Sequence, residues 1–321
     1  MIKKSSLIKL SILIPVYNSE KTIGRLVENI VSDLSPLFKL EIVLVNDNSL
    51  DNSEEICISL FEKFKENVKF YSLSKNVGEH SAVMAGLNKV TGDYVVIMDD
   101  DFQNPISEVV KLVNEAIEGR HDVVYSLYEK KRHSLFRNFG SWFNDKVANI
   151  MLKKPKDLYL SSFKVLNRFL VNEIIKYKSP FPYIDGIILQ ITNKIGKVRV
   201  EHSVREEGRS GYTIKKLISL WLNMFTNFSI LPLRLSIILG FLFALVGLFL
   251  GIYTVIEKIM NPALPVGFAS RFVGISVFAG IQLIILGMLG EYVGRIFLAI
   301  NKKPQYTIRK TYEHIDKENP Q

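Results

Sequence analysis

Short apolar runs alternate with helical patterns along the first part of the chain. The runs are rich in β-branched residues, as in buried strands, and cover residues 10–16, 41–45, 68–73, 94–98 and 122–126. Between them, apolar residues recur at the spacing of amphipathic helices, beginning near Ile23, Ile56, Ala82 and Val109. This alternation predicts an α/β fold, with a mostly parallel sheet covered by helices on both faces.

The pattern becomes less regular further along the chain. We expect a strand and turn over residues 161–168, a helix over 170–175, a loop over 180–186 and a late strand over 196–204. Polar residues follow three of the earlier runs, at Asp47, Asn76 and Asp99. The carboxyl ends of parallel strands share one edge of the sheet, which is where ligands bind in such folds. We therefore expect a binding site at that edge.

Three consecutive carboxylates, Asp99, Asp100 and Asp101, end the fourth strand-like run. Like charges repel, so a cation or hydrogen-bond donors must hold them together. Mg²⁺ and Mn²⁺ prefer oxygen ligands and need few protein carboxylates when substrate phosphates supply the rest. One interpretation is a metal and diphosphate site at Asp99, Asp101 and Gln103. The other is a solvated acidic turn before a helix, with Asn104 as its N-cap.

Two long segments near the C-terminus, residues 235–256 and 272–290, contain no charged residue. At about 1.5 Å per residue, each is of a length that approaches or spans the roughly 30 Å hydrocarbon core of a membrane. Lys and Arg residues lie on the outer flanks of the pair, which favours a cytoplasmic position for both flanks. We expect a multi-pass protein of the cell membrane, with its N-terminal domain and both termini in the cytoplasm.

The expected organisation has four parts. Residues 1–212 form a catalytic domain, in which the mixed cationic and aromatic stretch 129–156 is either a set of membrane-surface helices or an ordinary amphipathic helix docked on the sheet. Residues 213–233 form an interfacial amphipathic helix, 234–300 hold two transmembrane helices with a short loop, and 301–321 are a basic tail.

The net charge of +9 does not indicate a nucleic-acid partner. The Lys and Arg residues are scattered, and many flank the apolar segments, which fits anionic lipid head groups or phosphate-bearing substrates better than a duplex. Cys57 is the only cysteine, so no intrachain disulfide can form. The apolar segments also offer surface for self-association, so a homo-oligomer is an open expectation.

Five motifs together resemble a known family. They are residues 14–18, 45–53, 76–78, 99–105 and 205–212. The set is similar to the inverting GT-A glycosyltransferases of family 2. Within that family it resembles the branch that moves a sugar from a nucleotide donor to a polyprenyl phosphate, the dolichyl-phosphate mannose synthase and bactoprenol glucosyltransferase type. The resemblance covers nearly the whole chain, and the combination of motifs is specific although each alone is not.

The resemblance implies a donor site. Asp47 would recognise the nucleotide base, with Pro15 and Tyr17 lining the base pocket, and Asn76 and Gly78 would belong to a loop that closes over the donor. A carboxylate suits the first role because it can accept a hydrogen bond from a ring N–H. The alternatives are an Asx turn at Asp47 and a plain turn glycine at Gly78.

The resemblance also assigns roles to the acids. Asp99 and Asp101 form a DxD element, with a metal bridging the two donor phosphates and Gln103 completing its surroundings, and Asp101 is expected to be catalytic. The metal would neutralise charge on the leaving nucleoside diphosphate. The family often has a small residue at the position of Asp100, which contacts the donor ribose or faces away.

An acceptor phosphate is already a nucleophile, so its positioning by cations matters more than a base. The resemblance points to Lys164, where the family usually has Arg, with Arg137, Arg205 and Ser210 as further phosphate-binding residues. Lys lacks the bidentate fork of Arg. Asp157 matches an acid that is sometimes given a base role, and Arg137 can equally be ordinary surface charge.

The expected activity is metal-dependent, inverting transfer of a sugar from a nucleotide sugar to a polyprenyl phosphate, with UDP favoured by the resemblance. One rival is transfer to a glycan hydroxyl or another lipid, for which Asp185 would be wanted as the base. Another is a non-catalytic membrane scaffold that only binds nucleotide sugars.

Overall fold

The computed structural model of the protein describes residues 8–128, 155, 158–201, 231–262 and 267–314. The chain divides into two compact units. One comprises residues 1–213 together with 302–321, and the other comprises residues 214–301.

An eight-stranded sheet forms the centre of the first unit, with strand order β7-β5-β6-β4-β1-β2-β3-β8. The strands are β1 (Lys9–Val16), β2 (Lys39–Asn46), β3 (Val68–Leu73), β4 (Tyr94–Ile97), β5 (Val123–Tyr128), β6 (Lys164–Asn167), β7 (Ile195–Val200) and β8 (Ile308–Tyr312). The pairs β1–β2, β1–β4, β2–β3 and β5–β7 are parallel, whereas β6 and β8 run antiparallel to their neighbours. The sheet is therefore mostly parallel, as predicted.

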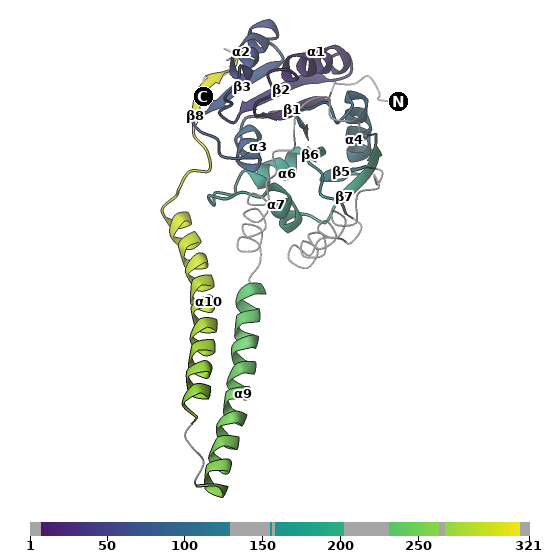
Figure 1. Cartoon of the computed structure of the whole chain (residues 1–321). Coiled ribbons are helices and arrows are strands. Elements are labelled where there is room, and N and C mark those ends of the chain that lie inside the picture. Colours follow the sequence, from purple (N-terminus) through teal and green to yellow (C-terminus); the bar gives the residue numbers. More distant parts are fainter. Residues whose placement is uncertain (1–7, 129–154, 156–157, 202–230, 263–266, 315–321) are drawn as a thin grey trace. The chain divides into compact units, whose positions relative to one another are not determined.

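Helices cover both faces of this sheet (Figure 1). One face carries α1 (Ile23–Leu34), α2 (Ser53–Lys63) and α4 (Ile106–Glu118), and the other carries α3 (Glu79–Leu87), α6 (Arg168–Ile174) and α7 (Ile184–Ile191). The helix α3 packs closely on β1 at Gly86, which has no side chain. A Cβ added there would lie only 2.1 Å from Leu13 Cδ1. The α/β prediction with helices on both faces is confirmed.

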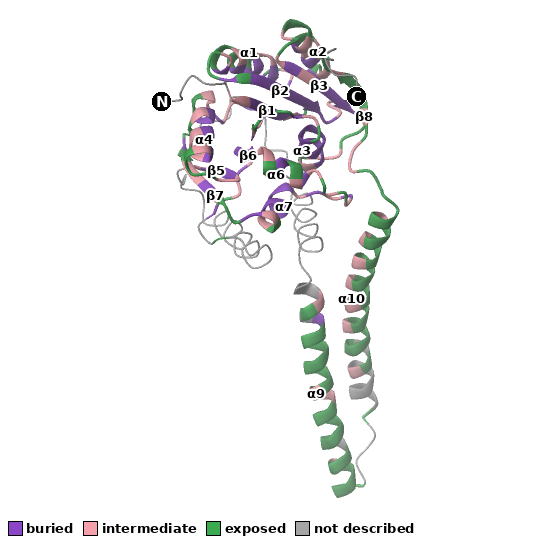
Figure 2. Ribbon diagram, turned by 180° about the vertical axis from the view of Figure 1, so that it is seen from behind, coloured by how far each residue is buried: buried purple, intermediate pink, exposed green. Residues whose placement is uncertain are grey.

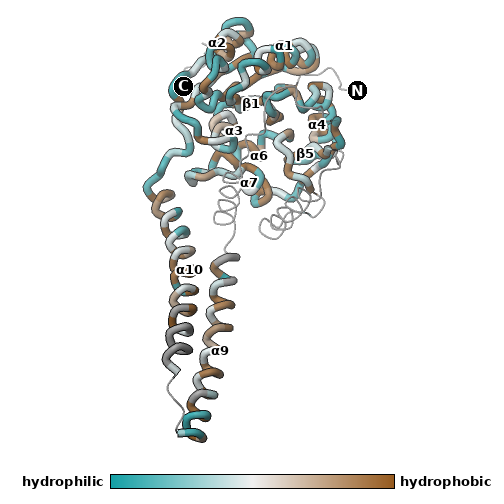
Figure 3. The backbone as a smooth tube through the Cα atoms, viewed as in Figure 1, coloured by the Kyte–Doolittle hydropathy of each residue, from teal (hydrophilic) through white to brown (hydrophobic). Residues whose placement is uncertain are grey.

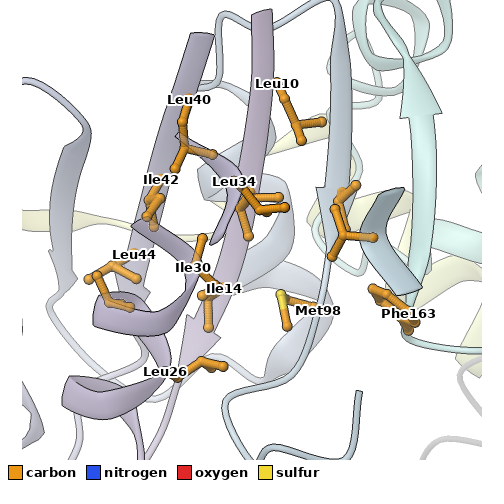
Figure 4. Close-up of a cluster of buried hydrophobic side chains, with 14 of the residues drawn as sticks. Leu10, Ile14, Leu26, Ile30, Leu34, Leu40, Ile42, Leu44, Met98 and Phe163 are labelled. Carbon is orange, nitrogen blue, oxygen red and sulfur yellow. The ribbon is translucent and has the colours of Figure 1, made fainter. Parts of the chain in front are cut away.

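The main core lies between the sheet and the α1 face. Alternate residues of β1 and β2, including Ile14 and Ile42, meet the apolar stripe of α1, which includes Leu26 and Ile30 (Figure 4). The two-residue period of a strand and the three- to four-residue spacing of α1 bring these side chains together. This packing fixes the strands whose carboxyl ends carry the polar clusters.

Two elements differ from the sequence-based expectation. The segment expected as a loop over residues 180–186 contains the start of α7 at Ile184, so Asp185 lies in the first turn of a helix. The strand β8 was not predicted, because residues 308–312 show no clear apolar alternation and follow the second apolar segment. It forms because β3 offers a free edge for antiparallel pairing.

The second unit contains the helices α9 (Leu231–Met260) and α10 (Phe268–Ile300). Their apolar parts, Ser236–Met260 and Val277–Ile300, have mean hydropathies of 2.4 and 1.9, and none of their most apolar stretch is buried (Figures 2 and 3). The core helix of a soluble domain would be buried, so exposed helices of this length are candidates to cross a membrane.

The helices α9 and α10 also contact one another. The rings of Phe243 and Phe278 meet edge to face at 6.3 Å, and Ser236 Oγ lies 3.6 Å from Met288 Sδ. The pairing of early residues in α9 with late residues in α10 makes the two helices antiparallel. The expected spans, 235–256 and 272–290, fall within this pair.

Candidate active site

The first two loops at the carboxyl edge of the sheet are joined by hydrogen bonds. Leu50 N donates to Asn18 Oδ1 at 2.8 Å, Asn18 N donates to Ser49 Oγ at 3.0 Å, and Ser19 N donates to Ser53 Oγ at 2.8 Å. Asn18 has a positive φ of 55°, a conformation that Asn tolerates better than most residues. The loop after β1, which contains the predicted base-pocket residue Tyr17, is thereby fixed to the loop after β2.

Asp47 lies directly after β2 and is buried, with 3% of its surface exposed. Its two carboxylate oxygens accept the amides of Val77 and Gly78, each at 2.8 Å. Gly78 has a φ of 89°, which a side chain would strain. Burial raises the pKa of Asp47, and the two amides partly offset that rise. The predicted base-recognition residue therefore also holds the predicted donor loop.

The side chain that stabilises the turn after β2 is Asn46. Its Oδ1 accepts from the backbone N and from Oγ of Ser49, at 3.1 and 2.6 Å. The Asx turn that was considered for Asp47 is therefore made by its neighbour Asn46. The carboxylate of Asp47 instead binds the loop after β3, which contains Val77 and Gly78.

Asp99 and Asp101 lie beyond the end of β4, at the same edge. Asp99 Oδ2 accepts from Ser162 Oγ at 2.6 Å, and Asp101 Oδ1 accepts from the backbone N of Gln103 at 3.1 Å. Phe102, which lies between Asp101 and Gln103, has a positive φ of 60°. Non-glycine residues in this region persist where their surroundings hold them, and they cluster at functional sites. We infer that the surrounding structure holds this turn, and with it the side chain of Asp101, in place.

Asp100 contacts the first loop. Its Oδ2 accepts from the Ser19 hydroxyl and from the backbone N of Tyr17, the latter at 3.4 Å. Burial raises the pKa of Asp100 to about 6, with the nearby Asp99 adding to the rise and Ser19 opposing it. The middle acid therefore ties β4 to the loop after β1.

The helix after the acids does not begin as the acidic-turn interpretation expects. The first residue of α4 is Ile106, and its start has no side-chain cap. Asn104 Oδ1 instead accepts from the hydroxyl of Tyr128 at 2.9 Å. Asn104 thus links the acidic loop to β5, and the expectation that it acts as an N-cap is wrong.

Lys164, the first residue of β6, is buried and is already paired. Its ammonium forms an ion pair with Asp185 and lies 5.2 Å from the ring centroid of Tyr125, whose hydroxyl also donates to Asp185 Oδ1 at 2.9 Å. Lys164 is 4% exposed and Asp185 is 6% exposed. An acceptor phosphate at Lys164 would have to share this cation with Asp185.

Two residues that the sequence analysis did not select, Glu79 and His80, open α3 beside this pair. The side chain of Glu79 reaches solvent. Desolvation by the surrounding protein, and next the negative charge of Asp99, nevertheless raise its pKa to about 7. Burial lowers the pKa of His80 to about 4, and its ring meets that of Tyr183 edge to face at 4.9 Å. The one feature of the sequence that could have indicated these two residues is their position directly after the 76–78 motif.

Several carboxylates lie near one another at this edge of the described structure. The carboxylates of Glu79, Asp99 and Asp100 influence one another electrostatically, since the charge of Asp99 raises the pKa of both Glu79 and Asp100. Among the described residues, no group of three or more His, Cys, Asp and Glu side chains is arranged to hold a metal ion. A cation held by Asp99 and Asp101 would therefore need further ligands from phosphate or water, as is common for Mg²⁺.

Several predicted residues lie outside the described part of the chain. They are Arg137, Asp157, Arg205 and Ser210. The predicted membrane-surface helices of residues 129–156 lie outside it except for Pro155, as does most of the interfacial helix of 213–233. In the described structure Asp47 contacts Gly78, and Asp100 contacts the amide of Tyr17. Asp99 and Asp101 lie in the loop after β4, and Lys164 lies in the neighbouring strand β6.

Comparison with known proteins identifies relatives along the whole chain. The sequence model of Glycosyl transferase family 2 matches residues 11–175. The undecaprenyl-phosphate 4-deoxy-4-formamido-L-arabinose transferase of Photorhabdus laumondii is 32% identical over 309 residues, which are 94% of each chain. That of Yersinia enterocolitica is 32% identical over 320 residues, which cover 98% of this chain and 96% of the relative.

Solved structures with a similar backbone include glucosyl-3-phosphoglycerate synthase of Mycobacterium tuberculosis. It is 19% identical, with a TM-score of 0.49, and the match covers 68% of this chain and 81% of that one. Another structure of that enzyme, in complex with Mn²⁺, UDP and glucosyl-3-phosphoglycerate, has the same TM-score and identity and is covered to 76%.

The family match covers more than half of the chain, and the relatives align with both of its units. The resemblance to family 2 and the expectation of a GT-A sheet are confirmed. The chain belongs to glycosyl transferase family 2 and is a glycosyltransferase with the GT-A fold.

Proposed function

We propose that the protein transfers a sugar, with inversion, from a UDP-sugar to undecaprenyl phosphate or a similar polyprenyl phosphate. The observation that carries the proposal is the presence, in one chain, of the acidic edge at Asp99 and Asp101 and of two exposed apolar helices, α9 and α10. A soluble acceptor would give the enzyme no need for such helices. Relatives named as undecaprenyl-phosphate transferases align over both parts.

The first two loops would bind the nucleotide. In this proposal Asp47 recognises the base, beside Pro15 and the exposed ring of Tyr17, while Asn76 and Gly78 close over the donor. The bonds from Val77 and Gly78 to Asp47 support this, because they couple the position of the donor loop to the base-binding carboxylate. Binding of the base and ordering of the loop would then favour each other.

Asp99 and Asp101, with Gln103 nearby, would hold Mg²⁺ or Mn²⁺. When bound, the metal would neutralise charge on the leaving nucleoside diphosphate. The residues of the chain contribute the fixed geometry: Ser162 orients Asp99, and the turn at Phe102 orients Asp101. Asp101 is the acid that we expect to matter most, because it is nearly buried and its direction is enforced.

The acceptor phosphate would attack without a base, since it is already an anion. Arg137, Arg205, Ser210 and Lys164 are the proposed phosphate-binding residues, and Asp157 remains a weaker candidate for a base. Asp185, the base that a hydroxyl acceptor would need, is engaged through Oδ1 by Lys164 and Tyr125, so a base role there would have to use Oδ2.

We further propose that α9 and α10 cross the cell membrane and that the catalytic unit and both termini lie in the cytoplasm. The cations flanking the two uncharged segments, including Arg234, Arg295, Lys302 and Lys303, support this orientation. Nucleotide sugars are made in the cytoplasm, so this orientation would also give the site access to its donor.

The test is a transfer assay on membranes that contain the full chain. Radiolabelled nucleotide sugars are added with undecaprenyl phosphate, and label in the lipid fraction is measured with Mg²⁺, with Mn²⁺ and with a chelator. We expect metal-dependent labelling with a UDP-sugar, which Asp101→Ala abolishes. The proposal fails if no donor labels the lipid, or if Asp101→Ala transfers sugar at the wild-type rate.

A further inference from the structure

The chain that follows α10 is part of the catalytic unit. Residues 302–321 group with residues 1–213, and β8 pairs with β3 at the edge of the sheet (Figure 1). The ring of Tyr312 stacks on Phe70 at a centroid distance of 5.7 Å. An unpaired edge strand leaves backbone donors and acceptors without partners. The returning segment therefore completes the sheet.

The same segment touches the donor side of the site. Ser74 N donates to the carbonyl of Thr307 at 2.9 Å. Ser74 begins the loop whose Val77 and Gly78 amides bind Asp47. One end of the donor loop is thus attached to the returning segment, and the other end is attached to the base-recognition carboxylate.

A second contact reaches the residues beside Asp47. Lys310 Nζ lies 2.6 Å from Glu54 Oε1. The other oxygen of Glu54 accepts from Ser72 Oγ at 2.6 Å and from Asn46 Nδ2 at 3.2 Å. Asn46 shapes the turn that carries Asp47, so Lys310 supports the donor site through one intermediate carboxylate.

The other end of the segment holds the loop before α7. Gln305 Nε2 donates to the carbonyls of Tyr177 and Ser179, at 2.9 and 2.7 Å. Lys303 Nζ lies 5.8 Å from the ring centroid of Phe181. This loop leads to Tyr183, which packs on His80, and then into α7, whose Asp185 pairs with Lys164.

We propose that residues 303–312 form a strap that positions the donor loop (residues 74–78) relative to the α7 loop (residues 177–183), with Gln305 and Lys310 as its positioning residues. The strand β8 is fixed to β3, and Gln305 and Thr307 make their contacts just before it, so this short segment holds the two loops relative to each other. The catalytic unit is then incomplete without the chain that follows both apolar helices. The kinetic consequences rest on the proposed function, whereas the strap rests on the contacts.

Hydrogen–deuterium exchange on the full chain in lipid nanodiscs tests the strap without relying on activity. Lys310→Ala should speed exchange of the amides in residues 74–80, and Gln305→Ala should speed it in residues 177–183. Each change should be about two- to fivefold, as expected for an exposed ion pair or a few hydrogen bonds. Arg309→Ala, which removes an exposed cation from the same strand, is the matched control and should leave both loops as in the wild type.

Steady-state kinetics provide the second readout. Lys310→Ala should raise the donor KM about two- to fivefold, with kcat within about twofold of the wild type, and Lys310→Arg should restore the donor KM. If the wild type transfers no sugar to polyprenyl phosphate, the proposed function fails but the exchange result still decides on the strap. The strap is overturned if neither loop exchanges faster, or if only β3 and β8 do while the donor KM is unchanged.

Discussion

The carboxylates at the two ends of the parallel strands differ in their surroundings. We call these ends the amino edge and the carboxyl edge of the sheet. At the amino edge, Glu41 is buried but satisfied: it pairs with Lys69 at 2.8 Å and accepts from Ser11 and from both the backbone N and Oγ of Thr91. Burial raises the pKa of Glu41, but these donors outweigh it and leave the pKa below its ordinary value. This edge is built to hold one negative charge.

At the carboxyl edge, two acids have raised pKa values instead. The pKa of Glu79 is raised to about 7 and that of Asp100 to about 6, in both cases first by desolvation and in part by the charge of Asp99, although the side chain of Glu79 reaches solvent. Lys164, the buried cation in the neighbouring strand β6, pairs with Asp185. Among the described residues, the fold thus surrounds the acid at the amino edge with donors but gathers several acids at the carboxyl edge, where a divalent cation would offset their charge and attract the phosphates of a donor.

The largest expected effect comes from removing Asp101, one of the two acids proposed to hold the metal. Asp101→Asn should lower the rate of transfer by about 10²- to 10³-fold, as for the loss of one electrostatic group at a developing charge. The rate is measured with labelled donor in nanodiscs. Glu62→Gln, which removes an exposed carboxylate from α2, is the control and should keep the wild-type rate. A rate for Asp101→Asn within tenfold of the wild type would contradict the assignment.

The next effect belongs to the amino edge and concerns stability. Glu41→Gln should lower the free energy of unfolding by about 2 kcal/mol at pH 7, because it weakens charged hydrogen bonds from Lys69, Ser11 and Thr91. For a unit of this size that is a fall in melting temperature of about 4–8 °C. The donor KM should not change. An unchanged melting temperature would show that this edge does not depend on the charge.

The pH dependence follows from the sign of the shift. Because the pKa of Glu41 is lowered in the folded protein, its stabilising contribution is present above the ordinary value of 4.5 and is lost as the pH falls through the lower folded value. The gap in melting temperature between the wild type and Glu41→Gln should therefore narrow below pH 4.5. A gap that widens in acid would contradict the direction of the shift.

The sequence predicted most of the sheet and part of the site. The strands β1 to β4 are buried apolar runs, and their polar ends share an edge by topology alone, so Asp47, Asp99 and Asp101 could be found without a structure. The strand β8 and the strap could not, because pairing with β3 depends on a distant segment with no apolar pattern of its own. Glu79 was missed for a similar reason: its charge matters only because Asp99 lies nearby in space.

The third effect is smaller and concerns pH at the carboxyl edge. The carboxyl of Glu79 loses its proton as the pH rises through about 7, which adds negative charge near Asp99. Because water screens the charge of this exposed side chain, apparent affinity for Mn²⁺ should rise between pH 6 and 8 by only about two- to fivefold. The wild type and Glu79→Gln are compared by Mn²⁺ titration of the transfer rate, and the variant should show a flatter dependence. Equal slopes would remove Glu79 from the site.

The smallest effect should come from Asp100, the acid that is tied to the first loop. Asp100→Asn keeps an oxygen that can accept from Ser19 and from the amide of Tyr17, so the loop geometry should survive and the transfer rate should fall by less than about fivefold. Asp100→Ala removes that acceptor and should cost more, in donor KM as well as in melting temperature. If Asp100→Asn instead loses as much activity as Asp101→Asn, the carboxyl edge uses all three acids together, and the division between a structural acid and two metal-binding acids is wrong.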